Sequence, residues 1–270
     1  APPGTLRAQP GGEPPEIPRP PPAGGCPPRA RGPPPSRPVR TPHHTASMPA
    51  IVGGGAIPRP GEISLSHRGV LFLDELAEFQ RPVLETLRQP MEDHVVTIAR
   101  SHSAVRFPAS FMLVAAMNPT PKGDMPAGEV GKRDMERYLA RISGPLLDRI
   151  DIHVEAPAVP WKSLAAAPTG TNTAQMRDQV GKARRAQVGR QGTATPNARL
   201  SGKQLDALAP LDESTRSLLG QAMTELGLSA RAYDKIRRVA RTIADLEGSE
   251  HIQSGHVSEA VQYRLLDRKV

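Results

Sequence analysis

Two acidic residues, Asp74 and Glu75, directly follow the apolar run Val70–Leu73 in the stretch RGVLFLDELAEF. A continuous apolar run of this kind is typical of a buried strand. Hydrolysis of a nucleoside triphosphate needs a metal ion and a group that activates water. The pattern therefore predicts that Asp74 holds Mg²⁺, mostly through water, and that Glu75 polarises the attacking water. Two exposed acids after an apolar strand also occur without any such function.

Three further residues are candidates for the same site. Asn118 ends the apolar run FMLVAAMNP and could hydrogen-bond both the water and a phosphate, although Asn-Pro pairs also simply begin turns. Arg149 follows a short apolar helical turn and could reach the nucleotide of a neighbouring subunit. Arg231 lies in the first turn of an expected helix, where the helix dipole attracts anions. For both arginines the alternative is a solvated side chain.

The usual phosphate loop, G-x-x-x-x-G-K-[ST], does not occur in the sequence, because the Gly-Lys pairs are followed by Arg133, Ala183 and Gln204. The backbone N–H groups and the lysine of such a loop make most contacts to the phosphates. The chain is therefore expected to carry the water-activating half of a nucleotide site and to lack the phosphate-binding half.

The elements that position these residues follow from the hydrophobic pattern. Between the two apolar strands lie a helical pattern over residues 81–93 and a hairpin pattern around RSHS, and a third strand is expected at IDIHVEAP, residues 150–157. Continuous apolar strands separated in this way indicate a parallel sheet covered on both faces. Ligands of such sheets bind beyond the carboxyl ends of the strands, where Asp74, Glu75 and Asn118 are expected.

The pattern becomes helical after Pro157. Ser229 is a plausible N-cap and Gly248 a plausible stop for one of these helices. The sequence thus predicts an α/β core followed by a small all-helical domain, with helices over residues 173–190, 201–209, 212–226, 229–247 and 254–268. Residues 1–36 are rich in proline, glycine and arginine and are predicted to be disordered, because they cannot bury enough apolar area.

Composition limits the partners. A net charge of +8 permits a nucleic acid or another polyanion, although a basic tail and solvated helix faces also explain it. The single cysteine, Cys26, excludes an internal disulfide and a cysteine zinc cluster. The pair His43-His44 lacks further ligands at a suitable spacing, so no zinc is expected. No apolar run approaches the ~20 residues of a membrane span, which leads us to expect no membrane contact and a cytoplasmic location.

Several long motifs resemble those of the magnesium-chelatase-like AAA+ ATPases of the ComM/YifB family, and the resemblance covers residues 37–270. It implies an incomplete AAA+ parallel-sheet core over residues 37–157, a linker and connecting helix over 158–198, and a helical lid domain over 199–270. The motifs are PHHTAS, IPRPGEISL, GVLFLDEL, FMLVAAMNP, RYLARISGPLLDRIDIHVE and LSARAYDKIRRVARTIADLEG.

The resemblance also implies roles for the candidate residues. Asp74 and Glu75 match the Walker B pair, Asn118 matches sensor 1, Arg149 the arginine finger and Arg231 the sensor 2 arginine. ATP and Mg²⁺ are the implied cofactors, and the intact protein is expected to form a homohexamer that acts on DNA.

Two further segments match features of this branch of the AAA+ ATPases. Residues 50–66 match a helix-2 insert and residues 95–107 a hairpin before sensor 1. In related helicases this hairpin projects toward the central pore, so DNA contacts are expected there, with a solvated turn as the alternative. The candidate DNA-binding residues are Arg100, His102 and Arg106.

The chain departs from the family pattern at two places. Residues 1–36 stand where the end of the phosphate loop is expected, which suggests a fragment whose first residues are out of frame or misjoined, with a divergent tail as the alternative. The sequence NPTPKG lacks the cysteines that many relatives carry in NPCPCG. Three functions therefore remain open: an ATPase motor acting on DNA, an ATP-dependent chelatase-type subunit, and a non-catalytic fragment unable to bind ATP.

Overall fold

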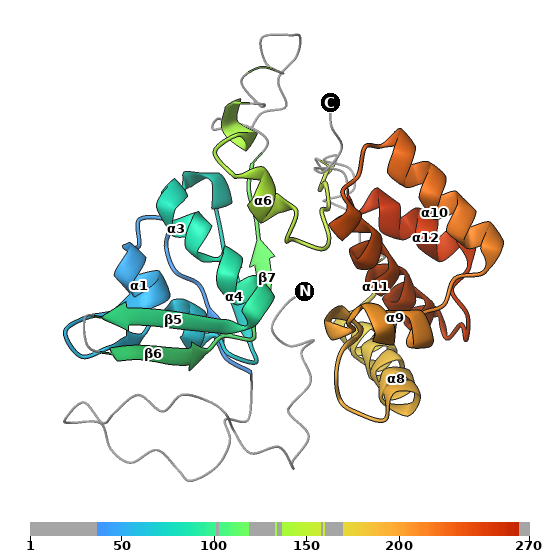
Figure 1. Ribbon diagram of the computed structural model, residues 1–270, viewed down its shortest axis with the longest axis horizontal. Coiled ribbons are helices and arrows are strands. Elements are labelled where there is room, and N and C mark those ends of the chain that lie inside the picture. Colours follow the sequence, from blue (N-terminus) through green and yellow to red (C-terminus); the bar gives the residue numbers. More distant parts are fainter. Residues whose placement is uncertain are drawn as a thin grey trace. The chain divides into compact units, whose positions relative to one another are not determined.

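The computed structural model describes residues 37–100, 103–118, 133, 137–157, 159 and 170–264, with the side chains of Arg100 and Ser103 left out (Figure 1). The chain divides after Arg149 into two compact units, the N-terminal unit and the C-terminal unit, and each has its own hydrophobic core. The tail predicted to be disordered, residues 1–36, and the candidate His102 lie outside the described residues.

A three-stranded sheet organises the N-terminal unit. Its strands are β1 (Val39–Arg40), β4 (Val70–Leu73) and β7 (Met112–Ala115), in the order β1-β4-β7. Both pairings are parallel, with Val39 opposite Val70 and Leu73 opposite Ala115. The central strand β4 is the most buried, since Leu71 and Leu73 have relative exposures of 0% and 1%. The parallel sheet predicted from the two apolar runs is confirmed.

The segment between β1 and β4 contains helix α1 (Met48–Val52), the two-stranded ribbon β2 (Gly53–Gly54) and β3 (Arg59–Pro60), and helix α2 (Glu62–Leu65). Gly53 has a φ of 103°, and a Cβ atom there would lie 2.3 Å from the carbonyl oxygen of Arg59. Only glycine tolerates both conditions. Arg40 donates from Nε and Nη2 to the carboxylate of Glu62 at 2.6 and 2.7 Å, which ties β1 to α2.

The helical pattern predicted over residues 81–93 forms two helices, α3 (Arg81–Thr86) and α4 (Arg88–Asp93). The break at Leu87 has a local cause, because Pro90 has no N–H to donate to the carbonyl group of Thr86. The hairpin that follows is confirmed and consists of β5 (Val95–Arg100) and β6 (Ser103–Pro108), paired antiparallel with Thr97 opposite Arg106.

The third strand predicted at residues 150–157 is wrong. Residues 151–157 form no strand, and Ile152 and Val154 are 49% and 72% exposed. Alternation of apolar residues produces a strand only where a neighbouring strand is available for pairing. Here the backbone N–H of His153 donates instead to the carbonyl oxygen of Tyr263 at 2.8 Å, and the guanidinium of Arg264 donates to the carbonyl oxygen of Ile150.

The C-terminal unit is helical, as predicted. In the part of the chain that the structure describes, its α-helices are α8 (Thr173–Gln191), α9 (Gly202–Leu208), α10 (Glu213–Glu225), α11 (Ala230–Glu247) and α12 (Ser254–Gln262), with a short 3-10 turn, η3 (Asn197–Arg199), between α8 and α9. Helix α11 is central: Ile236 and Ala240 are fully buried. The Ser229 side chain caps its first turn, and Gly248 ends it with a φ of 76°.

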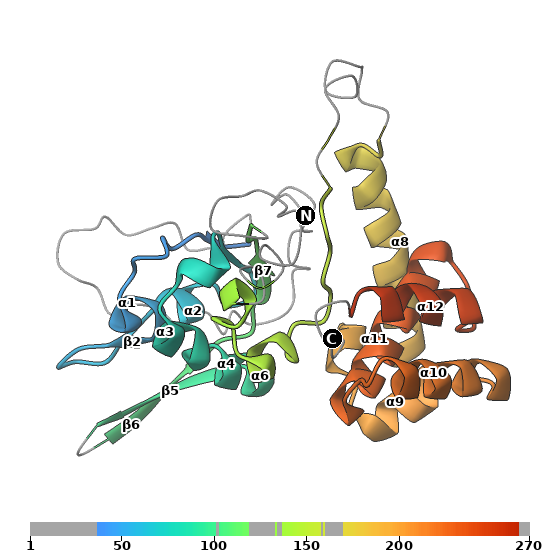
Figure 2. The ribbon, with the colours of Figure 1, turned by 90° about the horizontal axis from the view of Figure 1, so that it is seen from above.

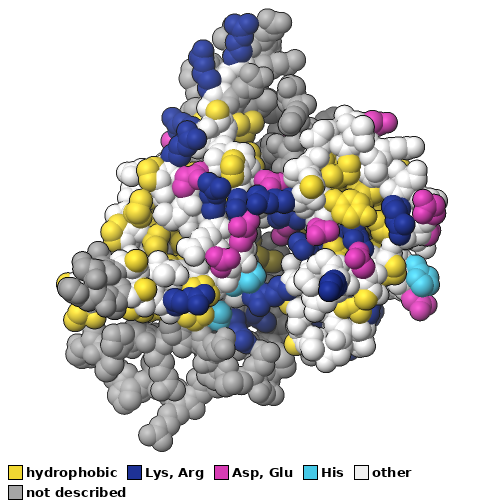
Figure 3. All heavy atoms as spheres, viewed as in Figure 1, with side chains coloured by type: hydrophobic (Ala, Val, Ile, Leu, Met, Phe, Trp, Pro, Cys, Tyr) yellow, Lys and Arg dark blue, Asp and Glu magenta, His cyan; other side chains and the backbone are white. Residues whose placement is uncertain are grey.

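One face of the molecule mixes both signs of charge. On the face seen in Figure 3, cationic and acidic side chains are interspersed on both units rather than gathered into blocks of one sign. Within the described residues, none of the helices combines the length and the apolar character needed to cross a membrane.

Candidate active site

The two acids Asp74 and Glu75 lie at the carboxyl end of β4, and both are exposed. Glu75 has a φ of 52° and a ψ of 48°, in the left-handed region that residues with a side chain seldom adopt. The backbone N–H of Glu75 donates to Oδ1 of Asp74 at 2.9 Å. The chain therefore turns sharply at the end of the strand. Strained backbone of this kind is concentrated at functional sites.

The neighbouring strand brings Asn118 to the same edge of the sheet. The backbone N–H of Ala116 donates to the carbonyl oxygen of Leu73, and the N–H of Leu76 donates to the carbonyl oxygen of Ala116, both at 2.9 Å. The segments that follow β4 and β7 thus stay paired beyond the two strands. Asn118 follows two residues later and is exposed. The structure therefore places Asp74, Glu75 and Asn118 at one edge.

A histidine contacts the carboxylate of Glu75. Nδ1 of His44 lies 2.8 Å from Oε2 of Glu75. The ring of His44 also contacts its neighbours, with 4.1 Å between the ring centroids of His43 and His44 and an edge-on contact with Phe79 at 6.4 Å. His44 belongs to the turn that follows β1, so it reaches Glu75 from the side of β4 opposite to β7. In the sequence, His44 stood out only as part of the motif PHHTAS, which does not indicate its contact with Glu75.

An ion pair fixes the turn that follows Glu75. Residues Leu76–Glu78 form a 3-10 turn, and Nη1 of Arg141 lies 3.0 Å from Oε2 of Glu78. The same guanidinium lies over the ring of Tyr138, 5.5 Å from its centroid. Burial, and then the negative charge of Glu78, raise the pKa of the Tyr138 hydroxyl. The backbone that carries Glu75 is therefore held by a cation as well as by the sheet.

Arg149 is held within the N-terminal unit. It follows helix α6 (Gly144–Leu147), whose first turn is capped by the side chain of Ser143. Its Nη1 donates to the carbonyl oxygen of Pro145 at 2.6 Å, and its Nη2 lies 2.8 Å from Oε1 of Glu92. The side chain is only 10% exposed. In this conformation Arg149 contacts groups of its own chain, and contact with any other group would require the ion pair with Glu92 to break.

The other predicted cations lie elsewhere. Arg231 is exposed in the first turn of α11, in the C-terminal unit. Arg106 is exposed on β6 of the hairpin, where it is opposite Thr97. Arg100 ends β5 and pairs through its backbone with Ser103. Arg106 and Arg100 thus belong to the hairpin and Arg231 to the C-terminal unit, whereas Asp74 and Glu75 follow β4.

The site fits a metal–nucleotide complex in part. Mg²⁺ is usually held by one or two carboxylates, several waters and the phosphates of its substrate, and Asp74 and Glu75 present exposed carboxylates of this kind. Among the described residues there is no cluster of three or more His, Cys, Asp or Glu that could hold a metal ion by itself. The described edge therefore has carboxylates that could serve the metal and water side of such a site.

A parallel sheet with two acids at its carboxyl edge, followed by a helical unit, is the architecture of an AAA+-type protein. Two family models match the chain: "Magnesium chelatase, subunit ChlI" over residues 28–164 and "Magnesium chelatase, subunit ChlI C-terminal" over residues 170–264. The chain belongs to this magnesium chelatase-like family, in the group that contains ComM and YifB.

Similar proteins come from several bacteria. The chain is 48% identical to "Competence protein ComM" of Haemophilus influenzae over 235 residues, and 44% identical to "Uncharacterized protein YifB" of Escherichia coli over 236 residues. An uncharacterized protein of Mycobacterium bovis is 39% identical over 236 residues. The matches cover 84–86% of this chain and 46% of each relative. The chain thus spans about half the length of the curated relatives that it matches.

Proposed function

We propose that the chain is the hydrolytic and lid portion of an ATP-driven AAA+ motor that acts on DNA. The observation that carries the proposal is the edge formed by Asp74, Glu75 and Asn118, where a strained turn after β4 exposes two carboxylates beside the end of β7. Membership in the magnesium chelatase-like family supports a nucleotide and Mg²⁺ as the cofactors.

Each residue at the edge has a proposed role. Asp74 would hold Mg²⁺ through water, and Mg²⁺ would there neutralise part of the negative charge on the phosphates of ATP. Glu75 accepts the proton of the attacking water, and Asn118 orients this water by a hydrogen bond. Positioning and electrostatic stabilisation are what phosphoryl transfer requires of a protein.

The contact between His44 and Glu75 adds a step to this mechanism. A carboxylate that is 2.8 Å from His44 has one oxygen occupied, and it is drawn toward the β1 side of β4. Asn118 lies beyond the other neighbour, β7. We propose that Glu75 leaves His44 when it contacts a water that Asn118 also holds. His44 accordingly sets the resting position of the catalytic carboxylate.

Subunit contacts complete the proposed site. An arginine that reaches the nucleotide of a neighbouring subunit accelerates phosphoryl transfer by about 10³–10⁵, and Arg149 is the proposed finger of a homohexamer. Its release from Glu92 is then part of assembly. Arg231, at the start of α11, is proposed to contact the phosphates from the C-terminal unit.

The proposed DNA contacts lie on the β5–β6 hairpin. Arg106 is exposed there, and Arg100 and His102 are the other proposed contacts around the turn. One relative is named as a competence protein. A role of this chain in DNA processing and a cytoplasmic location are parts of the proposal. An ATP-dependent chelatase-type subunit remains the alternative for this family.

Two measurements test the proposal. The first is a titration of a fluorescent ATP analogue into the chain. Binding supports a nucleotide site, and absence of binding supports a non-catalytic fragment that is unable to bind ATP. The second is DNA-stimulated ATP turnover in the loop-bearing protein, in which a Gly-Lys-Thr phosphate loop precedes residue 37. Turnover that DNA accelerates supports the motor. Turnover that depends on partner subunits and a metal-binding porphyrin, without a DNA effect, would support the chelatase.

A further inference from the structure

Helix α8 presents a strongly basic surface. Among its 19 residues are the cations Arg177, Lys182, Arg184, Arg185 and Arg190, and one acid, Asp178. Residues 171–179 are all exposed, and the buried residues of the helix are Ala183 and Gln187. Figure 2 shows the first turns of α8 extending beyond the other helices of the C-terminal unit. Most residues of α8 are therefore exposed and do not pack against the rest of the C-terminal unit.

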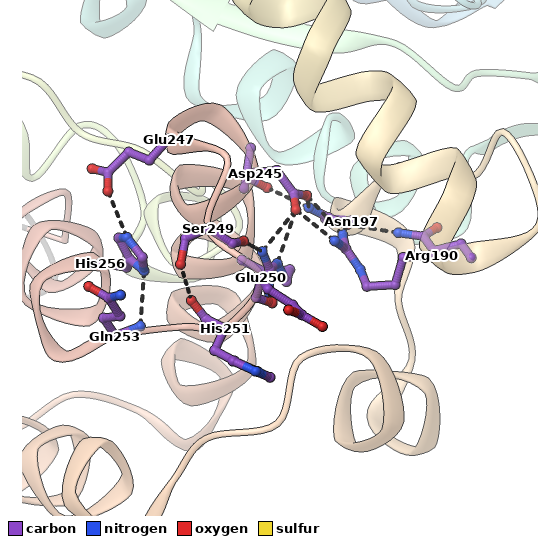
Figure 4. A network of polar contacts seen from close by, with 12 residues as sticks. Arg190, Asn197, Asp245, Glu247, Ser249, Glu250, His251, Gln253 and His256 are labelled. Atoms are coloured by element: carbon purple, nitrogen blue, oxygen red, sulfur yellow. Dashed lines mark hydrogen bonds and ion pairs between the residues drawn. The ribbon is translucent and has the colours of Figure 1, made fainter.

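The last turn of α8 is fixed to the unit by buried charges. Arg190 donates two hydrogen bonds, of 2.6 and 2.8 Å, to the carboxylate of Asp245 on α11, whose side chain is 1% exposed (Figure 4). Asn197 donates to the same carboxylate at 2.8 Å. Pairs of this kind hold a fixed geometry, because separating them strands a charge in the interior. The exposed part of α8 therefore has a defined direction relative to α11.

Three arginines surround a glycine on the exposed part of the helix. Arg177, Arg184 and Arg185 stand four residues before, three after and four after Gly181, so all three are its neighbours on one face. A Cβ atom at Gly181 would meet only Nη1 of Arg185, at 3.6 Å. The unit itself thus does not require glycine there, although glycine weakens a helix. Position 181 therefore places no side chain between the three arginines.

We call Arg177, Arg184 and Arg185, which surround Gly181, the α8 cation cluster. We propose that this cluster binds the phosphate backbone of DNA. The nine residues from Arg177 to Arg185 extend about 12 Å along the helix, which is eight steps of about 1.5 Å each. A strand of B-DNA places a phosphate about every 3.4 Å along its axis. The cluster thus covers several consecutive phosphates, which favours a polymer over a single nucleotide. The proposal rests on the DNA-binding part of the proposed function and adds a second contact surface to the hairpin.

Asp178 opposes this binding. Its carboxylate lies 2.8 Å from Nζ of Lys182, beside the cluster, and the hydrogen bond and charge of Lys182 lower its pKa. It is therefore ionised at neutral pH and repels a phosphate strand. Replacing it with Asn leaves the shape of the side chain and removes the repulsion, so the variant Asp178→Asn should bind DNA more tightly.

The test is fluorescence anisotropy of a short labelled duplex of mixed sequence, titrated with the chain as printed at several salt concentrations. The triple variant Arg177→Gln/Arg184→Gln/Arg185→Gln should reduce the slope of log K against log salt by roughly 2.7, or about 0.9 for each lost phosphate contact. The same three positions changed to Lys should keep most of the slope. Gly181→Leu should weaken binding by blocking the approach to the backbone.

Matched controls exclude a general loss of charge or of fold. Gly189→Leu lies on the same helix, where an added Cβ meets nothing within 4 Å, and Arg216→Gln removes an exposed arginine from α10. Both should bind DNA as the parent does. Circular dichroism should show an intact helix in every variant. An unchanged slope in the triple variant, or equal effects of the two leucine variants, would overturn the proposal.

The two proposals fail in different ways. Loss of DNA affinity in Arg106→Ala, with the triple variant unchanged, would keep the hairpin as the DNA contact and reject the α8 cation cluster. Binding of heparin without binding of DNA would also reject the cluster as a DNA site. In that case ATP turnover in the loop-bearing protein still decides the hydrolytic function, because that assay does not depend on α8.

Discussion

Asp245→Asn should be among the most destabilising conservative substitutions in the C-terminal unit. The carboxylate of Asp245 accepts hydrogen bonds from Arg190, Asn197 and Arg241, and the Nε of Arg241 lies 3.1 Å from Oδ1. Arg241 is itself only 2% exposed and also donates to the carbonyl oxygens of Ser249 and Glu250. The substitution keeps the shape and removes the negative charge between two guanidinium groups.

The magnitude follows from burial. Removing one partner of a buried ion pair costs about 3–5 kcal/mol, because the remaining charge stays in the interior without compensation. The exposed pair of Glu213 and Arg216, 3.5 Å apart, provides the control. Glu213→Gln should change stability by at most about 1 kcal/mol, as surface pairs do. The free energy of unfolding is measured by urea titration with circular dichroism at the helix band, which the helical C-terminal unit dominates.

The pH dependence of the free energy of unfolding provides a second test of the role of Asp245. Burial by itself raises the pKa of the Asp245 carboxyl, but the hydrogen bonds from Arg190 and Asn197 and the charge of Arg241 outweigh it and lower the pKa. The stabilisation is therefore complete above the ordinary pKa of about 3.9 and is lost as the pH falls below it. The parent and Asp245→Asn should differ most near neutral pH and converge in acid. Equal destabilisation by Asp245→Asn and Glu213→Gln, or a difference that does not change with pH, would refute this reasoning.

Three further substitutions test the N-terminal unit. His44→Ala in the loop-bearing protein should raise basal ATP turnover and leave the KM for ATP unchanged, because it releases Glu75. His43→Ala is the control, and a lower turnover in His44→Ala would contradict the proposal that His44 sets the resting position of Glu75. Glu92→Gln should increase the mobility of Arg149, seen as faster hydrogen exchange after α6, and an unchanged exchange rate would count against the contact. Arg149→Ala should reduce turnover by about 10³-fold or more while each subunit still binds ATP, and turnover near the parent rate would remove Arg149 from the site.

Local signals predicted much of the fold. The continuous apolar runs indicated β4 and β7, and the β-branched residues on either side of RSHS indicated the hairpin. Helix α11 was predictable with its limits, since Ser229 and Gly248 act within one turn of the helix that they end. Signals of this kind are read from a few neighbouring residues. They hold wherever the tertiary structure supports the local preference.

The wrong strand and the contacts that were not predicted come from interactions that no local pattern contains. Residues 150–157 alternate like a strand, but a strand forms only against a partner, and this segment bonds instead to the end of the C-terminal helices through Tyr263. The contact of His44 with Glu75 joins residues far apart in the sequence. The contact of Arg149 with Glu92 likewise joins two residues far apart in the sequence. The sequence thus predicted which residues form the candidate site, but it did not predict the contacts that they make.

The most direct test of the account compares ATP binding and ATP hydrolysis in the loop-bearing protein and its Glu75→Gln variant. The variant keeps the size and hydrogen-bonding capacity of the side chain and loses the base. We expect ATP to bind with the affinity of the parent, hydrolysis to stop, and the ATP-bound oligomer to accumulate. Hydrolysis at the parent rate in Glu75→Gln would contradict the assignment of Glu75 as the residue that activates water.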